Sequence, residues 1–240
     1  MKQILLFFSF LLYTSFCFPQ ESFSFDIFSA RLDNSTLLVS DAGGNVFYRH
    51  TFNNPSAIEY DLDDDGIGEL LLLDSSGVNG KNLYKVFIYN TVDSFYLVDS
   101  IISGSYEPYE TVSQEIGSTI IITGNAECEI YNGNSEFVFL PLNCWKYEAG
   151  EVYLINDEIY ELFITENEAI TDFIDEYFSS NINNCNTTER LKPAIMSAYI
   201  NYINAGEKSI ASQFIKKYYL CGDIEKFTLE LNNLAQTENN

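Results

Sequence analysis

Basic residues are scarce in this sequence. Its 240 residues include 12 Lys and Arg against 35 Asp and Glu, which gives a formal net charge of -23. A surface of that sign repels nucleic-acid phosphates and anionic lipid head groups, so we expect no nucleic-acid partner. Hydrophobic residues make up 46% and aromatic residues 15% of the chain, which is enough for a packed core and excludes a disordered protein.

Groups for nucleophilic catalysis are also few. The single histidine, His50, follows Arg49 at the end of a predicted strand, which is typical of an exposed position and not of a catalytic base. Gly43 and Gly44 belong to a predicted hairpin turn with no following helix or lysine, so they do not form a phosphate-binding loop. A hydrolase that uses two carboxylates needs neither feature and stays open as an alternative.

Long hydrophobic runs are absent beyond the N-terminus. An apolar stretch from Ile4 to Phe18 follows Lys2 and gives way to polar residues, a pattern that predicts a signal peptide over residues 1–20. The stretch is shorter than the ~20 residues that a membrane-spanning helix needs. We therefore expect an exported protein, secreted or in the periplasm or cell envelope, with no membrane insertion after signal cleavage.

Cleavage after Cys17 would leave four cysteines in the mature chain, and an even number in an exported protein predicts disulfides. Cys185 precedes one predicted helix and Cys221 ends the next, so an antiparallel pair of helices brings them to the same end. We expect a Cys185–Cys221 disulfide and, by elimination, pairing of Cys128 with Cys144. Buried thiols are the alternative for these residues.

Short strands dominate residues 21–163. Runs rich in β-branched and aromatic residues alternate with turn residues such as Asp41–Asn45 and Ala149-Gly150. This pattern predicts an antiparallel β-rich domain.

Helical periodicity replaces the strand pattern over residues 164–236, and a polar tail follows at 237–240. Thr165 and Glu168 are spaced as a capping box, Pro193 is expected in the first turn of a second helix, and Gly206 is expected to end it. Asp223 is a good cap for the last helix. The sequence therefore predicts an α+β fold in which about four C-terminal helices follow the β region.

The stretch "YDLDDDGIGELLLLD", residues 60–74, is unusually rich in carboxylates. Counted from Asp61, acidic side chains occupy positions one, three, five and nine, and Gly66 at position six permits a sharp bend. No Lys or Arg lies between Arg49 and Lys81 to offset their mutual repulsion. Hard oxygen ligands in this spacing suit Ca²⁺. We expect a calcium site formed by Asp61, Asp63, Asp65, the carbonyl of Ile67, and Glu69.

An EF-hand is excluded because position twelve is Leu72, within an apolar run that predicts a strand. The loop instead resembles the calcium loop of FG-GAP or VCBS-type β-propeller repeats, whose pattern is D-x-D-x-D-G-x-x-D, and the resemblance covers about residues 40–100. Glu69 departs from the usual Asp. The resemblance implies a propeller-blade-like or sandwich-like sheet with calcium bridging a hairpin. Closed propellers need about four to eight blades of ~40 to 45 residues, so the β-rich region of residues 21–163 is too short to form one.

These features predict an exported, non-enzymatic binding or interaction module with calcium as a structural staple and a protein or carbohydrate partner. The alternative is a secreted hydrolase with a carboxylate pair. A third possibility is an envelope component that works within a larger assembly.

Overall fold

The computed structural model describes residues 21–78, 80–132 and 137–236, so the predicted signal peptide and polar tail lie outside the described residues. The chain divides into two compact units, one ending at Thr51 and the other beginning at Phe52.

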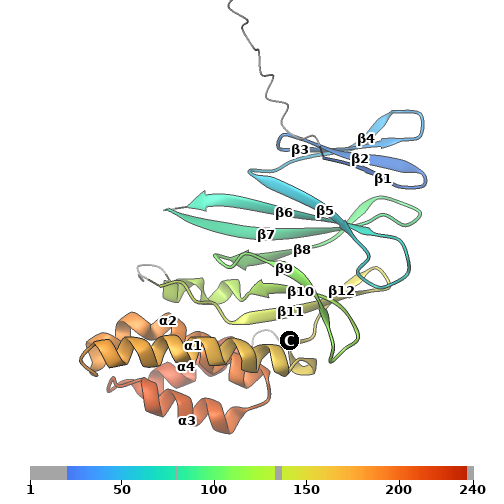
Figure 1. The fold of residues 1–240 in the computed structure, drawn as a ribbon. Helices are drawn as coiled ribbons and strands as arrows, with labels where there is room; N and C mark the ends of the chain where they lie inside the picture. Colours follow the sequence, from blue (N-terminus) through green and yellow to red (C-terminus); the bar gives the residue numbers. More distant parts are fainter. Residues whose placement is uncertain (1–20, 79, 133–136, 237–240) are drawn as a thin grey trace, which may run out of the picture. The chain divides into compact units, whose positions relative to one another are not determined.

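The first unit is a four-stranded antiparallel meander (Figure 1). Along β2 every second side chain is buried, as expected for a strand with one covered face. Asp41 closes the predicted hairpin turn, because its Oδ1 accepts hydrogen bonds from the N–H groups of Gly43 and Asn45 at 2.9 and 2.8 Å. The strands are β1 (Glu21–Ser24), β2 (Phe28–Asp33), β3 (Thr36–Asp41) and β4 (Val46–Thr51).

The second unit begins with two further four-stranded antiparallel meanders. One contains β5 (Pro55–Tyr60), β6 (Glu69–Val78), β7 (Lys81–Asn90) and β8 (Tyr96–Gly104). The other contains β9 (Tyr109–Ser113), β10 (Ser118–Gly124), β11 (Leu142–Glu148) and β12 (Glu151–Leu154). None of the three sheets in the described chain closes into a barrel or ring, and helices follow them. The predicted α+β layout is therefore confirmed.

Strand β10 is buried on both faces, which explains its continuous apolar run. Ile121 packs with Leu71 and Val86 of the β5–β8 sheet. Its neighbours Ile120 and Ile122 point the other way and pack with Phe163 of the first helix. The β9–β12 sheet therefore lies between the β5–β8 sheet and the helices, as Figure 1 shows.

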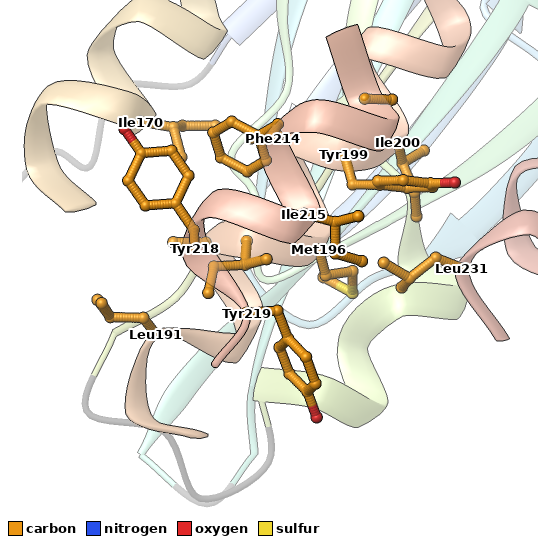
Figure 2. Packing of buried hydrophobic residues seen from close by; sticks show 14 of the residues in the cluster. Ile170, Leu191, Met196, Tyr199, Ile200, Phe214, Ile215, Tyr218, Tyr219 and Leu231 are labelled. Carbon is orange, nitrogen blue, oxygen red and sulfur yellow. The ribbon is translucent and has the colours of Figure 1, made fainter. Parts of the chain in front are cut away.

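The helical layer has a core of its own, in which side chains from all four helices interlock (Figure 2). Met196 and Ile200 of α2 meet Phe214 of α3 and Leu231 of α4 there. The helices are α1 (Glu161–Ser180), α2 (Cys185–Asn204), α3 (Lys208–Tyr218) and α4 (Ile224–Gln236), and the 3₁₀ helices are η1 (Ala126–Asn132) and η2 (Asn156–Glu158).

The start of α1 differs from the predicted capping box at Thr165. The helix begins at Glu161, so the predicted boundary between residues 163 and 164 falls within its first turn. Glu115, from the β9–β10 connection, accepts hydrogen bonds from the N–H groups of Tyr160 and Glu161 at 3.0 and 3.2 Å. A carboxylate distant in sequence thus satisfies the first donors of the helix.

Pro193 also lies elsewhere than predicted, inside α2 and not in its first turn. The helix begins earlier because Asn184 caps it, its Oδ1 accepting from the N–H of Thr187 at 3.1 Å. Gly206 follows the end of α2 with a φ of +78°, in agreement with the predicted stop.

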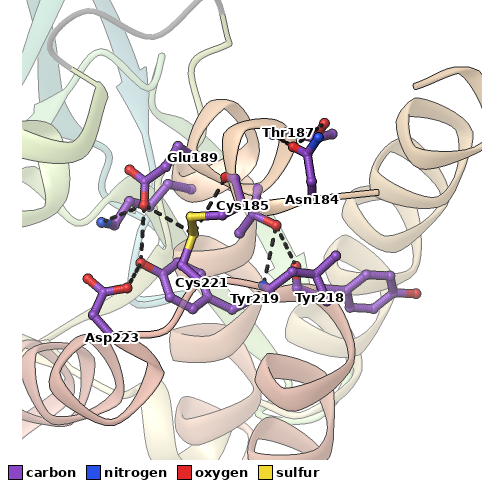
Figure 3. The surroundings of a disulfide bond; sticks show 11 residues. Asn184, Cys185, Thr187, Glu189, Tyr218, Tyr219, Cys221 and Asp223 are labelled. Atoms are coloured by element: carbon purple, nitrogen blue, oxygen red, sulfur yellow. Dashed lines mark hydrogen bonds and ion pairs between the residues drawn. A yellow bond between two sulfur atoms is a disulfide. The ribbon is translucent and has the colours of Figure 1, made fainter. Parts of the chain in front are cut away.

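The predicted Cys185–Cys221 disulfide is confirmed and joins the start of α2 to the segment after α3 (Figure 3). The predicted pairing of Cys128 with Cys144 is wrong. Both thiols are buried without a disulfide between them. Cys128 packs in the helical core and Cys144 in the core between β10, β11 and α1.

Asparagine side chains complete one edge of β11 where the short strand β12 does not reach. The N–H of Leu142 donates to Oδ1 of Asn201 at 3.0 Å, and its carbonyl accepts from Nδ2 of Asn204 at 3.4 Å. The N–H of Cys144 donates to Oδ1 of Asn156 at 2.8 Å. Amides from α2 and η2 therefore take the place of a neighbouring strand.

Among the described residues, no helix has both the length and the apolar character needed to cross a membrane.

Candidate metal centre

The acidic loop connects β5 to β6, whose last pairing joins Tyr60 to Glu69. Leu62 is buried in the core between the two sheets of the second unit and anchors the loop. Asp64 and Gly66 have φ values of 60° and 87° and provide the bend. Gly66 therefore provides the predicted bend, and the side chain of Asp64 is exposed.

The three loop aspartates converge. Asp61, Asp63 and Asp65 each offer a carboxylate oxygen within 4.8 Å of the others. Ca²⁺ binds oxygen at about 2.3–2.6 Å, so oxygens on opposite sides of one ion are about 5 Å apart. The spacing of these three side chains fits a shared calcium ion.

Hydrogen bonds within the loop occupy some of these oxygens and leave others without a partner. Oδ2 of Asp61 accepts from the N–H of Gly66 at 2.9 Å, and Oδ1 of Asp65 accepts from the N–H of Ile67 at 2.7 Å. Oδ1 of Asp61 and Oδ1 of Asp63 are buried and have no hydrogen-bond partner. Buried acceptors without partners are costly, and a cation would satisfy them.

Glu69 opens β6 and is only 1% exposed. Its Oε2 accepts a hydrogen bond from the N–H of Leu62 at 3.0 Å, whereas its Oε1 is buried without a partner. Burial, with the negative charges of Asp63 and Asp65, raises the pKa of Glu69 to about 7. The structure therefore concentrates negative charge here that a divalent ion would neutralise.

The pKa of Asp63 is raised as well, by burial first and then by the charges of Asp65 and Asp61. Two hydrogen bonds act in the opposite direction, because Asp63 accepts from the N–H of Asp65 and, with a smaller effect, from the N–H of Ala149 in the β11–β12 turn. Asp63 thus links the loop to the neighbouring sheet. Ala149 itself has a φ of 53°, in the left-handed region.

The loop borders a hollow of about 360 Å³. Its walls come from the β7–β8 turn, including Asn90 and Tyr96, and from the β11–β12 turn. Tyr147 supports the wall by donating from its hydroxyl to Oδ1 of Asn90 at 3.3 Å. The sequence predicted the Ala149-Gly150 turn but not its position beside the loop, because that position depends on how the two sheets pack.

The structure also places His50, Trp145 and a cluster around the Cys185–Cys221 disulfide. His50 lies in β4, in the first unit, paired with Leu37 of β3. Trp145 is half-buried and donates from Nε1 to Oγ1 of Thr123 at 2.9 Å. Cys185, Glu189 and Cys221 also cluster, but their sulfur atoms form the disulfide and offer no thiolate (Figure 3).

No protein-family model, curated protein or solved structure significantly matches this chain. The likeness to FG-GAP or VCBS repeats therefore stays a prediction that rests on the loop residues alone.

Proposed function

We propose that this protein is an exported, non-enzymatic interaction module of the FG-GAP/VCBS-like type, in which Ca²⁺ staples the β5–β6 loop. The ligands are Asp61, Asp63, Asp65, the carbonyl of Ile67, and Glu69. Export is supported by the apolar N-terminal sequence and by the Cys185–Cys221 disulfide, since such bonds persist in oxidising compartments.

One observation carries the calcium proposal. Buried oxygens of Asp61, Asp63 and Glu69 lack hydrogen-bond partners, in a loop where a carboxylate oxygen from each of the three aspartates lies within 4.8 Å of the others. A solvated acidic turn would expose such oxygens to water. An ion supplies the missing partner for all of them at once.

The expected stabilisation is modest. Extracellular modules bind calcium with dissociation constants of about 10⁻⁴ to 10⁻³ M, so 1 mM calcium would add about 0.4 to 1.4 kcal/mol to the free energy of unfolding. For a chain of this size that corresponds to a rise in melting temperature of about 1 to 6 °C. This magnitude suits a structural staple.

The test is thermal unfolding of the chain in 1 mM calcium and in chelator, with calorimetric titration of calcium at 25 °C. We expect Asp63→Asn and Asp65→Asn to abolish the calcium-dependent shift. Asp64→Asn is the matched control, because it removes a charge from the same loop at an exposed residue, and asparagine tolerates its positive φ. A wild-type protein that melts identically with and without calcium rules the proposal out.

A secreted hydrolase is the second candidate. The raised pKa values of Glu69 and Asp63 beside a hollow favour it, since carboxylate-pair hydrolases raise the pKa of their acid. Against it, Glu69 is 1% exposed and Leu62 holds one of its oxygens, which leaves a substrate little access. Turnover of model glycosides that disappears in Glu69→Gln would favour the hydrolase.

A further inference from the structure

Part of the proposed calcium loop lines the hollow. Asp63, Asp65 and Glu69 contribute both to the proposed ligand set and to the lining of the hollow. An ion held by these carboxylates would therefore lie at the base of a recess of about 360 Å³, where a second molecule can reach it.

The loop does not supply a complete coordination sphere. One oxygen from each of Asp61, Asp63 and Asp65 can be combined with the Ile67 carbonyl and with Oε1 of Glu69. The other oxygen of Glu69 is held by the N–H of Leu62. Ca²⁺ takes about six to eight oxygens, so roughly one to three positions are left for water or for oxygens of a ligand.

The negative charge of the recess determines whether a charged or a neutral ligand can supply the remaining oxygens. Asp93 adds a fourth carboxylate to the recess, beside Asp63, Asp65 and Glu69, and the described lining contains no Lys or Arg. One Ca²⁺ neutralises only part of this charge, so a carboxylate or phosphate ligand would still be repelled. A pair of neutral hydroxyl groups can coordinate calcium without that cost.

The wall offers an aromatic surface next to the ion. Tyr96 lines the recess and is 44% exposed. The Tyr96 hydroxyl lies close to the β11–β12 turn on the opposite wall, since a Cβ added to Gly150 would lie 3.3 Å from the hydroxyl oxygen. An exposed tyrosine ring with a polar tip can pack against the C–H face of a sugar while its hydroxyl forms a hydrogen bond.

We propose that the recess binds a neutral sugar, with two adjacent hydroxyls completing the coordination of the calcium ion and Tyr96 packing against the ring. This inference rests on the proposed calcium site. It assigns the site a ligand class, which a purely structural staple would not have.

The experiment presents the full chain with immobilised neutral glycans ending in mannose, galactose or fucose, in 2 mM calcium and in chelator. Sialylated versions of the galactose glycans test the charge argument. We expect binding of at least one neutral terminus in calcium, loss of that binding in chelator, and weaker binding once sialic acid adds a carboxylate. Tyr96→Ala should weaken binding about tenfold and leave the calcium-dependent melting shift unchanged.

Tyr153→Ala is the matched control, because Tyr153 is also 44% exposed but lies on β12, outside the lining of the recess. Its binding should equal that of the wild type. If calcium shifts the melting temperature but no neutral glycan binds, the sugar proposal is overturned and the staple stands. If calcium causes no shift, both proposals fail. Binding of a lysine-rich peptide in chelator that calcium abolishes would identify the recess as a cation site for a basic partner instead, and would also overturn the sugar proposal.

Discussion

The N–H of Leu62 donates a hydrogen bond of 3.0 Å to Oε2 of Glu69, so the second residue of the acidic loop is held by the first residue of the strand that follows. The bond crosses the base of the loop and fixes the Glu69 side chain in the interior. The same carboxylate therefore has a structural role through one oxygen and a proposed metal-binding role through the other.

Glu69→Gln separates these two roles. The amide oxygen of glutamine can still accept from Leu62, but the buried charge is gone. In chelator at pH 8 we expect the free energy of unfolding of the variant to be about 1 to 3 kcal/mol higher than that of the wild type, because the variant no longer buries an uncompensated charge. In calcium its melting shift should be smaller. Urea unfolding in both solutions measures the difference, and a variant less stable than wild type in chelator would contradict it.

The pH dependence of the calcium-depleted protein follows from the same group. The pKa of Glu69 in the folded state, about 7, is higher than its ordinary value of 4.5. The folded state therefore binds the Glu69 proton more tightly than the unfolded state does. This difference stabilises the fold fully below pH 4.5, and the stabilisation is lost as the pH rises through 7. We expect the urea midpoint in chelator to fall between pH 5 and pH 8. The fall should be smaller in calcium and in Glu69→Gln, and a midpoint that rises over this range would refute the assignment.

The disulfide makes a separate prediction about the helical layer. Cys185 and Cys221 are 36 residues apart in sequence, and closing a loop of that length stabilises a protein by about 3 to 4 kcal/mol in the chain-entropy treatment. We expect the free energy of unfolding of the double variant Cys185→Ser, Cys221→Ser to be lower than that of the wild type by about this amount.

The free thiols make a further prediction. Native labelling with a thiol reagent should leave the buried Cys128 and Cys144 unmodified in the wild type. Rapid labelling of either thiol would show that their cores open more easily than the packing implies.

Gly124 is a position where any side chain would collide. A Cβ there would lie 2.6 Å from Cβ of Tyr106 and 2.8 Å from the carbonyl oxygen of Ser103. Because one neighbour is backbone, the clash cannot be relieved by a rotamer change, and we expect Gly124→Ala to destabilise by about 1 to 3 kcal/mol. Gly77→Ala is the control, since a Cβ on Gly77 would have no neighbouring atom within 4 Å. Equal unfolding midpoints for the two variants would contradict the packing at Gly124.

Local sequence patterns predicted much of the fold. The turns at Asp41–Asn45 and Ala149-Gly150 separate strands as predicted, and Gly206 ends a helix as expected. What they share is that the determining residues are neighbours in sequence. The Cys185–Cys221 disulfide could be predicted in a similar way, because a single helical hairpin brings the two cysteines together.

The misplaced start of α1 and the unpredicted half of the recess involve partners that the sequence pattern does not bring together. Thr165 looked like the cap of α1, yet Glu115 from another connection satisfies the N–H groups of Tyr160 and Glu161, about one turn earlier. The convergence of Asp61, Asp63 and Asp65 agrees with their spacing in the sequence, whereas the second half of the recess was not predicted. Tyr96 comes from β8 in the same sheet as the loop, whereas Ala149 reaches the loop only through the packing of two sheets, and no local pattern encodes either placement.

The asparagines that border β11 have a consequence for how the protein behaves when it is concentrated. An exposed strand edge with unpaired N–H and carbonyl groups invites a strand from another molecule to add to it. Here Asn201, Asn204 and Asn156 already occupy those groups from the helical side. These asparagines therefore block the addition of a strand from another molecule at this edge of β11, which disfavours edge-to-edge polymerisation and amyloid-like growth there.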